Sequence, residues 1–293
     1  MVSVSEALAH YRNNSLDIID LPRLDGAITH LNDLMGENQL SDIDVIACRS
    51  YREARRAALV IRHKKLYNTS DSTVARELGV LKAASNNALK WKLLTADLMP
   101  TFEIPNDLPK RVIWLLDDEM KRMYDTAHHD EIMYMFIKLL YFTGSRRTAI
   151  ESLEWSQVDL INKVIHLAKP DEKKTNKRRP TIPLNAAMCE ALSDFPTRGK
   201  YRYVFRRNTN RYGALIKLFE DARILDLPEK DGRPAGRMTP HILRHTRATH
   251  LLENGMPLYG VAKLLGDNPS TVERVYAHAC VSKLRDCLDR YSV

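Results

Sequence analysis

Residues 239–278 read TPHILRHTRATHLLENGMPLYGVAKLLGDNPSTVERVYAHA, and the spacing of the apolar residues in this stretch predicts three short helices. The first is expected to have Thr239 as its N-cap and Pro240 as its first residue, because threonine accepts backbone N–H groups and proline fixes a helical φ. It should end at Gly255, since glycine is common just past a helix C-terminus. This part of the chain is therefore expected to be mainly helical.

The other two helices of the stretch are also bounded by residues that start or stop helices. We expect the second over 257–265, with Gly266 as its stop. The third should begin with Ser270 as its N-cap, because Glu273 three residues later completes a capping box. The loop between the second and third helices then forms a tight corner.

Chemically active side chains gather at the ends of these helices. His241, Arg244 and His245 fall in the first turn of the first helix, Asp267 lies at the corner, and Tyr276 lies on the third helix. Arginine holds two phosphate oxygens at once, and a tyrosine hydroxyl can act as a nucleophile. These residues are therefore candidates for one functional site.

The composition is compatible with an intracellular protein that binds a polyanion. A chain of 293 residues is long enough for two domains with separate cores. Lys and Arg number 45 and the formal net charge is +8, a balance that suits nucleic acid but also occurs in proteins that bind none. The four cysteines form no CxxC pair, and neither a signal peptide nor a membrane-length apolar run is seen. We expect a cytoplasmic protein.

Motifs in a fixed order connect this stretch to an earlier one. The segment GSRRTAIESLEW, at 144–155, follows an apolar segment and places Arg146 after a glycine. HxLRH at 241–245, LLG at 264–266 and YxH at 276–278 then follow. Together these motifs resemble those of the tyrosine recombinases, the phage integrase and Xer class. The resemblance is close in the C-terminal part of the chain and loose over the first hundred residues.

The resemblance implies a two-domain DNA-breaking-rejoining enzyme fold that is mainly α, with a small antiparallel β-sheet in the C-terminal domain. Residues 1–104 would form a helical, SAM-like core-binding domain, 105–111 a linker, and 112–293 the catalytic domain. The three prolines of 99–111 independently mark a linker. Because the core-binding domain would begin almost at residue 1, no separate arm-binding domain is expected.

The first 104 residues are expected to be wholly helical. The clearest helix begins in the polar cluster 70–72 and continues to about Leu94, with its period running through Gly79. A helix-turn-helix over 72–91 is the alternative, because ARELGV resembles the turn of such a motif. Candidates for phosphate contacts, unless they only form a solvated face, are Arg52, Arg55, Arg56, Arg62, Lys64 and Lys65.

The catalytic domain should begin with helices and continue into strands. Helices are expected over 114–127, over 131–143 before Gly144, and from Arg147 to Leu153. Strand candidates are 163–168, 181–184 and 201–205. The first two would be neighbouring strands, with the basic run 169–180 as a positive tip between them.

Phosphodiester exchange explains why these residue types occur together. Attack by Tyr276 gathers negative charge on the non-bridging oxygens, which the guanidinium groups of Arg146 and Arg244 would stabilise. Tyrosine titrates near 10, so we expect the arginine pair to stabilise the phenolate and His241 to accept a hydrogen bond or the proton. Zinc is an alternative role for His241 and His245, which are four residues apart, although the sequence offers no third ligand.

The leaving 5′ oxygen needs an acid, and a lysine can supply it. By resemblance to KTxKxR before a strand, this role goes to Lys174, with Lys173 and Lys177 as alternatives. His278 could also reach the site, but a structural role is favoured.

Two positions depart from the family pattern. Asp267 stands where the family has histidine or tryptophan, and Ala149 stands three residues after Arg146, where the family has an acid. A carboxylate beside a phosphate repels it unless the carboxylate is paired. Our hypothesis is that Asp267 supplies the missing acidic support to Arg146 or Arg244.

These features predict a site-specific DNA recombinase of a phage or mobile element, or an Xer-like resolvase. It would act as a homo-tetramer on two double-stranded DNA sites through a covalent 3′-phosphotyrosine, without ATP or metal, and its C-terminal tail would dock on a neighbouring subunit. The alternatives are a DNA-binding regulator of the same fold that has lost catalysis and a type IB-like topoisomerase.

Overall fold

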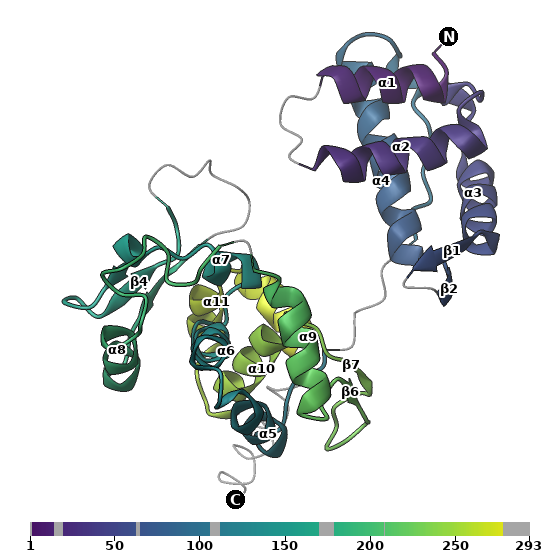
Figure 1. Ribbon diagram of the computed structural model, residues 1–293. Helices are drawn as coiled ribbons and strands as arrows, with labels where there is room; N and C mark the ends of the chain where they lie inside the picture. Colours follow the sequence, from purple (N-terminus) through teal and green to yellow (C-terminus); the bar gives the residue numbers. More distant parts are fainter. Residues whose placement is uncertain are drawn as a thin grey trace, which may run out of the picture. The chain divides into compact units, whose positions relative to one another are not determined.

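Helices dominate the part of the chain that the computed structural model describes, which is residues 2–14, 20–62, 65–105, 112–169, 179–207 and 209–277. The chain divides into two compact units, Met1–Pro109 and Lys110–Val293 (Figure 1). The remaining elements are short antiparallel sheets, so the prediction of a mainly α fold with small antiparallel sheets is confirmed. In the described residues, no helix is both long and apolar enough to cross a membrane.

In the described residues of the first unit, four helices surround one apolar core. They are α1 Val4–Asn14, α2 Leu21–Met35, α3 Val45–Ala57 and α4 Asp71–Lys90, with short 3-10 turns at Leu40–Asp42 and Ala96–Leu98. Asp20, Asp44 and Ser70 each accept a backbone N–H at the start of a helix. Helices α1, α2 and α4 pack against one another and bury Leu8, Leu31, Leu78 and Leu81 (Figure 1).

The long helix α4 is continuous. It covers 20 residues from Asp71 to Lys90 and runs through Gly79 without a turn, which excludes the helix-turn-helix alternative. Ser70 caps it as expected, but it ends at Lys90 and not near Leu94. The chain leaves the helical path just after it, where Lys92 has a φ of 60°.

A hairpin between α3 and α4 shows that the expectation of a wholly helical first unit was wrong. Strand β1 Leu59–Arg62 pairs antiparallel with β2 Lys65–Asn68, with Leu59 opposite Asn68. Branched apolar residues such as those in the sequence LVI fit a pleated strand better than a helix. Lys64 and the side chains of Arg62 and Lys65 lie outside the described residues, so their expected phosphate contacts remain predictions.

Arg55 is part of the core of the first unit, so the prediction that it contacts phosphate was wrong. Its side chain is only 6% exposed and donates two hydrogen bonds of 2.9 Å to the carboxylate of Glu77. The hydroxyl of Tyr51 donates a third, of 2.8 Å, to the same carboxylate. Arg52 instead pairs with Asp71 at the surface, where its side chain remains 38% exposed. The contacts of Arg52 and Arg56 with DNA remain predictions.

This difference in burial predicts different effects on stability. Arg55→Ala leaves Glu77 buried without its charged partner, and such changes cost about 3–5 kcal/mol of unfolding free energy. Arg52→Ala removes an exposed pair and should cost less than about 1 kcal/mol. Urea unfolding of the full chain, followed by circular dichroism, measures both. Equal losses for the two variants would contradict the structural role of Arg55.

The first half of the segment expected to be a linker belongs to the first unit. Met99, Phe102 and Ile104 are partly buried against its core, and Arg49 pairs with Glu103 at 2.8 Å. Residues 106–111 lie outside the described residues.

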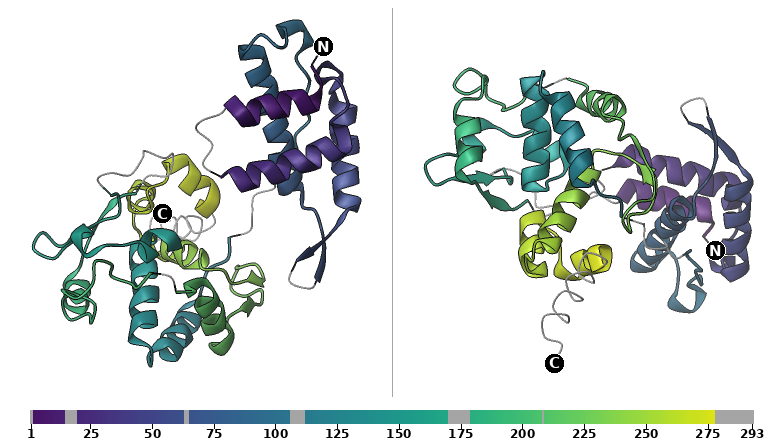
Figure 2. Two further views of the ribbon diagram at one scale, coloured as in Figure 1. Left: turned by 45° about the horizontal axis from the view of Figure 1, so that its top comes forward. Right: turned by 90° about the horizontal axis from the view of Figure 1, so that it is seen from below.

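The second unit is built on helices that cover one large apolar core. They are α5 Asp117–Ala127, α6 Glu131–Thr143, α7 Arg147–Glu151, α8 Ala186–Ser193, α9 Arg211–Asp221, α10 Ile242–Glu253 and α11 Leu258–Leu265, followed by a helix over 269–277. Helix α10 packs against α6 and α11, and Figure 2 shows these segments from two further directions. The ends of α6, α10 and α11 are thereby brought together.

A three-stranded antiparallel sheet with the order β3-β4-β5 lies at one edge of the second unit, beside α8 (Figure 1). It consists of β3 Val158–Asp159, β4 Val164–His166 and β5 Thr181–Pro183, with Ile165 opposite Ile182. The expected pairing of the strands on either side of the basic run is confirmed. Two further strands, β6 Asp226–Leu227 and β7 Gly236–Arg237, pair antiparallel.

Some expected boundaries in the second unit were wrong. Residues 201–205 form no strand and make only an isolated bridge between Glu154 and Tyr203. Helix α10 begins at Ile242, with His241 in the N-cap position, because Thr239 and Pro240 belong to the preceding turn. His278 and the expected docking tail lie outside the described residues.

The last described helix also starts earlier than expected. It begins at 269, where proline fits a first turn that needs no N–H donor. The carbonyl of Asn268 accepts the N–H of Thr271 at 3.0 Å and that of Val272 at 3.1 Å. Ser270 therefore lies inside the helix and is not its cap.

Candidate active site at the ends of α6, α10 and α11

Gly144 positions Arg146 just beyond α6. It ends that helix in the left-handed conformation, with a φ of 60°, which only glycine adopts at little cost. A Cβ at this position would also lie 2.7 Å from Cδ2 of Leu265. The chain then turns so that Arg146 takes the N-cap position of α7, where its side chain is 31% exposed.

Arg244 forms hydrogen bonds to the C-terminal ends of both α6 and α11. Its side chain is 3% exposed, and Nη1 donates hydrogen bonds of 2.9 Å to the carbonyls of Gly144 and Leu265. These carbonyls lie at the C-terminal ends of α6 and α11, where a positive charge is favourable. The guanidinium of Arg244 is therefore held in place by backbone from two distant segments.

Asp267 joins the two arginines. Gly266 ends α11 with a φ of 67°, and the N–H of Asp267 then donates to the carbonyl of Ala262 at 3.1 Å. One carboxylate oxygen accepts a hydrogen bond of 3.1 Å from Nη2 of Arg146, and the other accepts one from Nη2 of Arg244. Asp267 thus contacts both residues that it was expected to support, and its contribution to catalysis remains a prediction.

The neighbours of Arg146 explain why this arginine, and not the next one, faces Asp267. Arg147 forms an ion pair with Glu151 one turn further along α7. Ala149 is buried and contributes only its backbone N–H, which donates to the carbonyl of Arg146 at 2.9 Å. Position 149 thus supplies no acid to Arg146, whose carboxylate partner is Asp267.

Tyr276 lies against the same helices with its hydroxyl buried. The residue is 3% exposed and packs with an apolar cluster from α10, α11 and its own helix, namely Ala248, Leu252, Val261, Ala262, Leu265 and Val272. Burial raises the pKa of Tyr276 to about 12, and the positive charge of Arg244 opposes this rise only in part. The expected lowering of the phenol pKa by the arginine pair is therefore outweighed by loss of hydration.

In this structure the hydrogen-bonding partner of Tyr276 is His245 and not His241, and the expected catalytic role of His241 remains a prediction. The distance between Nδ1 of His245 and the tyrosine hydroxyl is 2.8 Å. His245 lies within α10 and is partly buried, whereas His241 is in the N-cap position of that helix. The sequence offered no local signal that separates the two histidines, because residues four apart lie on the same side of a helix.

His241 lies in the electrostatic environment of the arginines. Loss of hydration, followed by the positive charges of Arg244 and Arg146, lowers the pKa of His241. Its ring is edge-on to that of His245, with the ring centroids 4.9 Å apart. The two histidines therefore serve different neighbours, with His241 near the guanidinium groups and His245 at the tyrosine.

Lys173, Lys174 and Lys177 lie outside the described residues, so the assignment of the acid remains a prediction. The strands β4 and β5 on either side of them are paired at His166 and Thr181. Within the described residues, no group of three or more His, Cys, Asp or Glu side chains could hold a metal ion.

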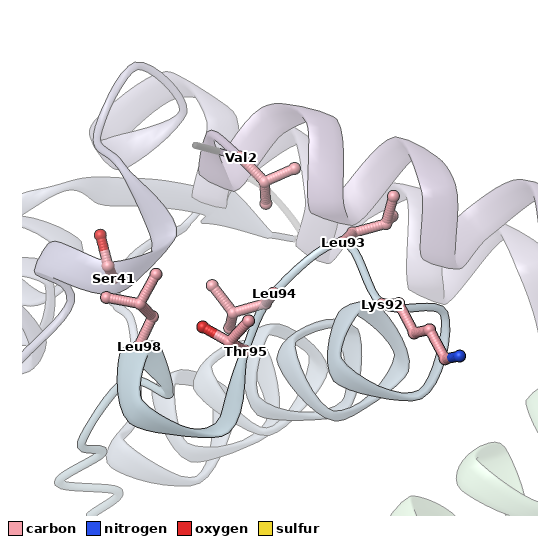
Figure 3. A pocket seen from close by; sticks show the side chains of 7 residues that line it. All are labelled: Val2, Ser41, Lys92, Leu93, Leu94, Thr95 and Leu98. Atoms are coloured by element: carbon pink, nitrogen blue, oxygen red, sulfur yellow. The ribbon is translucent and has the colours of Figure 1, made fainter.

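A pocket in the first unit contains none of these residues. Its volume is about 220 Å³, and Figure 3 shows that Val2, Leu94 and Leu98 form much of its wall, with Lys92 at one side. Its lining has the hydroxyl groups of Ser41 and Thr95 and a single cation, Lys92, but no acid and no histidine. The open surface around Arg146 and Asp267 is a better place for phosphate chemistry.

Comparison with known proteins agrees with this geometry. The model of the phage integrase family matches residues 113–282, which is more than half of the chain. Tyrosine recombinase XerD of Staphylococcus epidermidis is 27% identical over 86% of this chain and 85% of its own.

Solved structures show the same fold. The Tn1549 transposon integrase in complex with transposon right end DNA covers 100% of both chains with a TM-score of 0.76 and 18% identity. A lambda integrase tetramer bound to a Holliday junction covers 92% of this chain and 77% of its own with a TM-score of 0.63 and 17% identity. The chain belongs to the phage integrase family, whose members are tyrosine-type site-specific DNA recombinases.

Proposed function

We propose that this protein cuts and rejoins double-stranded DNA at specific sites through a covalent bond between Tyr276 and a 3′ phosphate. The observation that carries the proposal is the meeting of Arg146 and Arg244 at one carboxylate, beside the helix that bears Tyr276. Two fixed guanidinium groups suit the two non-bridging oxygens of a phosphodiester, which gain charge as it is attacked.

Asp267 can support the arginines while phosphate is bound. A guanidinium has five N–H donors, and the contact with Asp267 uses only Nη2 of Arg146. The other nitrogens of Arg146 are then available to phosphate oxygens, while the carboxylate keeps the two guanidinium groups from repelling each other. His241, beside the same arginines, donates a further hydrogen bond to the phosphate.

The reaction has two reversible halves. The Tyr276 oxygen attacks phosphorus as its proton leaves, the bond to the 5′ oxygen breaks, and Lys174, or else Lys173 or Lys177, protonates that oxygen. The 5′ hydroxyl of another strand then attacks the phosphotyrosine and releases the enzyme. The covalent bond conserves the energy of the broken linkage, so ATP and metal have no role.

The likeness to a solved integrase tetramer supports the proposed oligomeric state. The lambda integrase in the tetramer bound to a Holliday junction shares this fold, which supports a homo-tetramer acting on two DNA sites. The first unit acts as the core-binding domain and the second as the catalytic domain, and the residues beyond 277 dock on a neighbouring subunit. The protein works in the cytoplasm on DNA of a phage, a mobile element or the chromosome.

One observation favours a second candidate, a regulator that binds DNA without cutting it. An ionised carboxylate lies between the two arginines, where its charge opposes that of an incoming phosphate. In such a protein Asp267 would hold the arginines for structure alone, and Tyr276 would remain buried.

Covalent capture separates these functions. The full chain is incubated with a pool of nicked duplexes of random sequence, so that the short fragment released by cleavage diffuses away and the adduct is trapped. We expect an adduct that survives denaturation and enriches one sequence, and no adduct with Tyr276→Phe, which lacks the nucleophile. Site-selective binding by the wild-type protein without an adduct would instead indicate the regulator, and relaxation of plasmids that lack the enriched sequence would indicate a topoisomerase.

Substitutions of Asp267 test its support of the arginines. Asp267→Ala leaves Arg244 with an unpaired buried charge and should slow adduct formation by roughly 10–100-fold, as losses of supporting groups do at other sites. Asp267→Glu keeps the charge and should be faster than Asp267→Ala. Adduct formation on the captured duplex is timed for each variant, with thermal unfolding as a check on folding. Equal rates for the wild type and both variants would remove this role.

A further inference from the structure

We infer that His245, and not His241, accepts the proton of Tyr276 during strand cleavage and returns it during rejoining. This inference rests on the proposed function. Its geometric basis is the 2.8 Å separation of Nδ1 of His245 and the hydroxyl of Tyr276. A proton acceptor must be within hydrogen-bond reach of the proton that it takes, and this distance meets that condition.

The surroundings of Tyr276 make a nearby acceptor necessary. The residue is 3% exposed and its ring lies in an apolar cluster, so bulk water is remote from the hydroxyl in this state. Burial also disfavours the phenolate. The proton therefore needs a base that is already within hydrogen-bond reach of the hydroxyl.

The charged side chains near Tyr276 already make hydrogen bonds to other groups or cannot accept a proton. Arg244 is always charged and cannot accept a proton, and its Nη1 donates to two backbone carbonyls. Both oxygens of Asp267 accept hydrogen bonds from guanidinium groups. His241 is not the residue that contacts the hydroxyl of Tyr276 in this structure, where that contact is made by His245.

The proton transfer balances without any further reactant. The imidazole tautomer with its proton on Nε2 leaves Nδ1 as an acceptor. When the Tyr276 oxygen forms its bond to phosphorus, the O–H bond breaks and the proton moves to Nδ1, giving an imidazolium. When a 5′ hydroxyl later displaces the tyrosine, the imidazolium returns the proton to the phenolate oxygen as the O–P bond breaks.

Helix α10 carries a matched control. His250 also contacts a tyrosine through Nδ1, at 2.9 Å from the hydroxyl of Tyr141, and its Nε2 lies 2.9 Å from the carbonyl of Leu115. This second pair joins α10 to α6 and lies outside the proposed chemistry. Its removal shows how much the loss of a structural His–Tyr contact alone changes the rate of adduct formation.

The test replaces His245 by a side chain of matching shape without basicity. In His245→Asn the amide occupies the position of Nδ1 and accepts the hydrogen bond but cannot take the proton. With the duplex captured by the wild-type protein as probe, we expect adduct formation to slow by about 10²–10³-fold, with unchanged DNA binding, because general-base catalysis is typically worth that much. His250→Asn should form the adduct at nearly the wild-type rate.

A more acidic phenol distinguishes proton transfer from positioning. Incorporation of 3,5-difluorotyrosine at position 276 lowers the phenol pKa and should restore adduct formation in His245→Asn by tenfold or more, while leaving the wild-type rate little changed. Wild-type rates in His245→Asn, or a slow variant that the fluorinated tyrosine does not rescue, would overturn the inference. Failure of the wild-type protein itself to form an adduct would instead overturn the proposed function.

Discussion

The carboxylate of Asp267 between the guanidinium groups of Arg146 and Arg244 is the interaction on which the second unit depends. Arg244 is almost fully buried, and a buried charge without a partner is costly. The same arginine binds the last carbonyls of α6 and α11, so the ion pair also fixes the directions of three helices. Stability and the site consequently rest on the same few atoms.

In this structure, the charged side chains of the site pair with one another. Each carboxylate oxygen of Asp267 has a guanidinium partner, and the hydroxyl of Tyr276 is buried at His245. Burial raises the pKa of Tyr276 to about 12, so its hydroxyl stays protonated at neutral pH. In the proposed reaction, bound DNA offers phosphate oxygens to the arginines and the tyrosine turns toward them.

Much of this arrangement is predictable from the sequence because glycines and capping residues act locally. Gly144 and Gly266 end helices where expected, and Arg146 follows the first of them directly. The partner of Tyr276 was not predictable in this way, because His241 and His245 are four residues apart and lie on the same side of α10, so local spacing does not choose between them. Contacts between side chains from distant segments depend on tertiary packing, which the local sequence pattern does not predict.

The first unit shows the same limit. Arg55 and Arg52 lie on one helix and look equivalent in sequence, but only Arg55 meets the buried carboxylate of Glu77, 22 residues later.

The measurement that tests the account most directly is a structure of the Tyr276→Phe protein with its captured duplex. We predict that nitrogens of Arg146 and Arg244 both lie about 2.7–3.2 Å from non-bridging oxygens of one phosphate, with residue 276 beside it. A scissile phosphate that contacts neither guanidinium would contradict it.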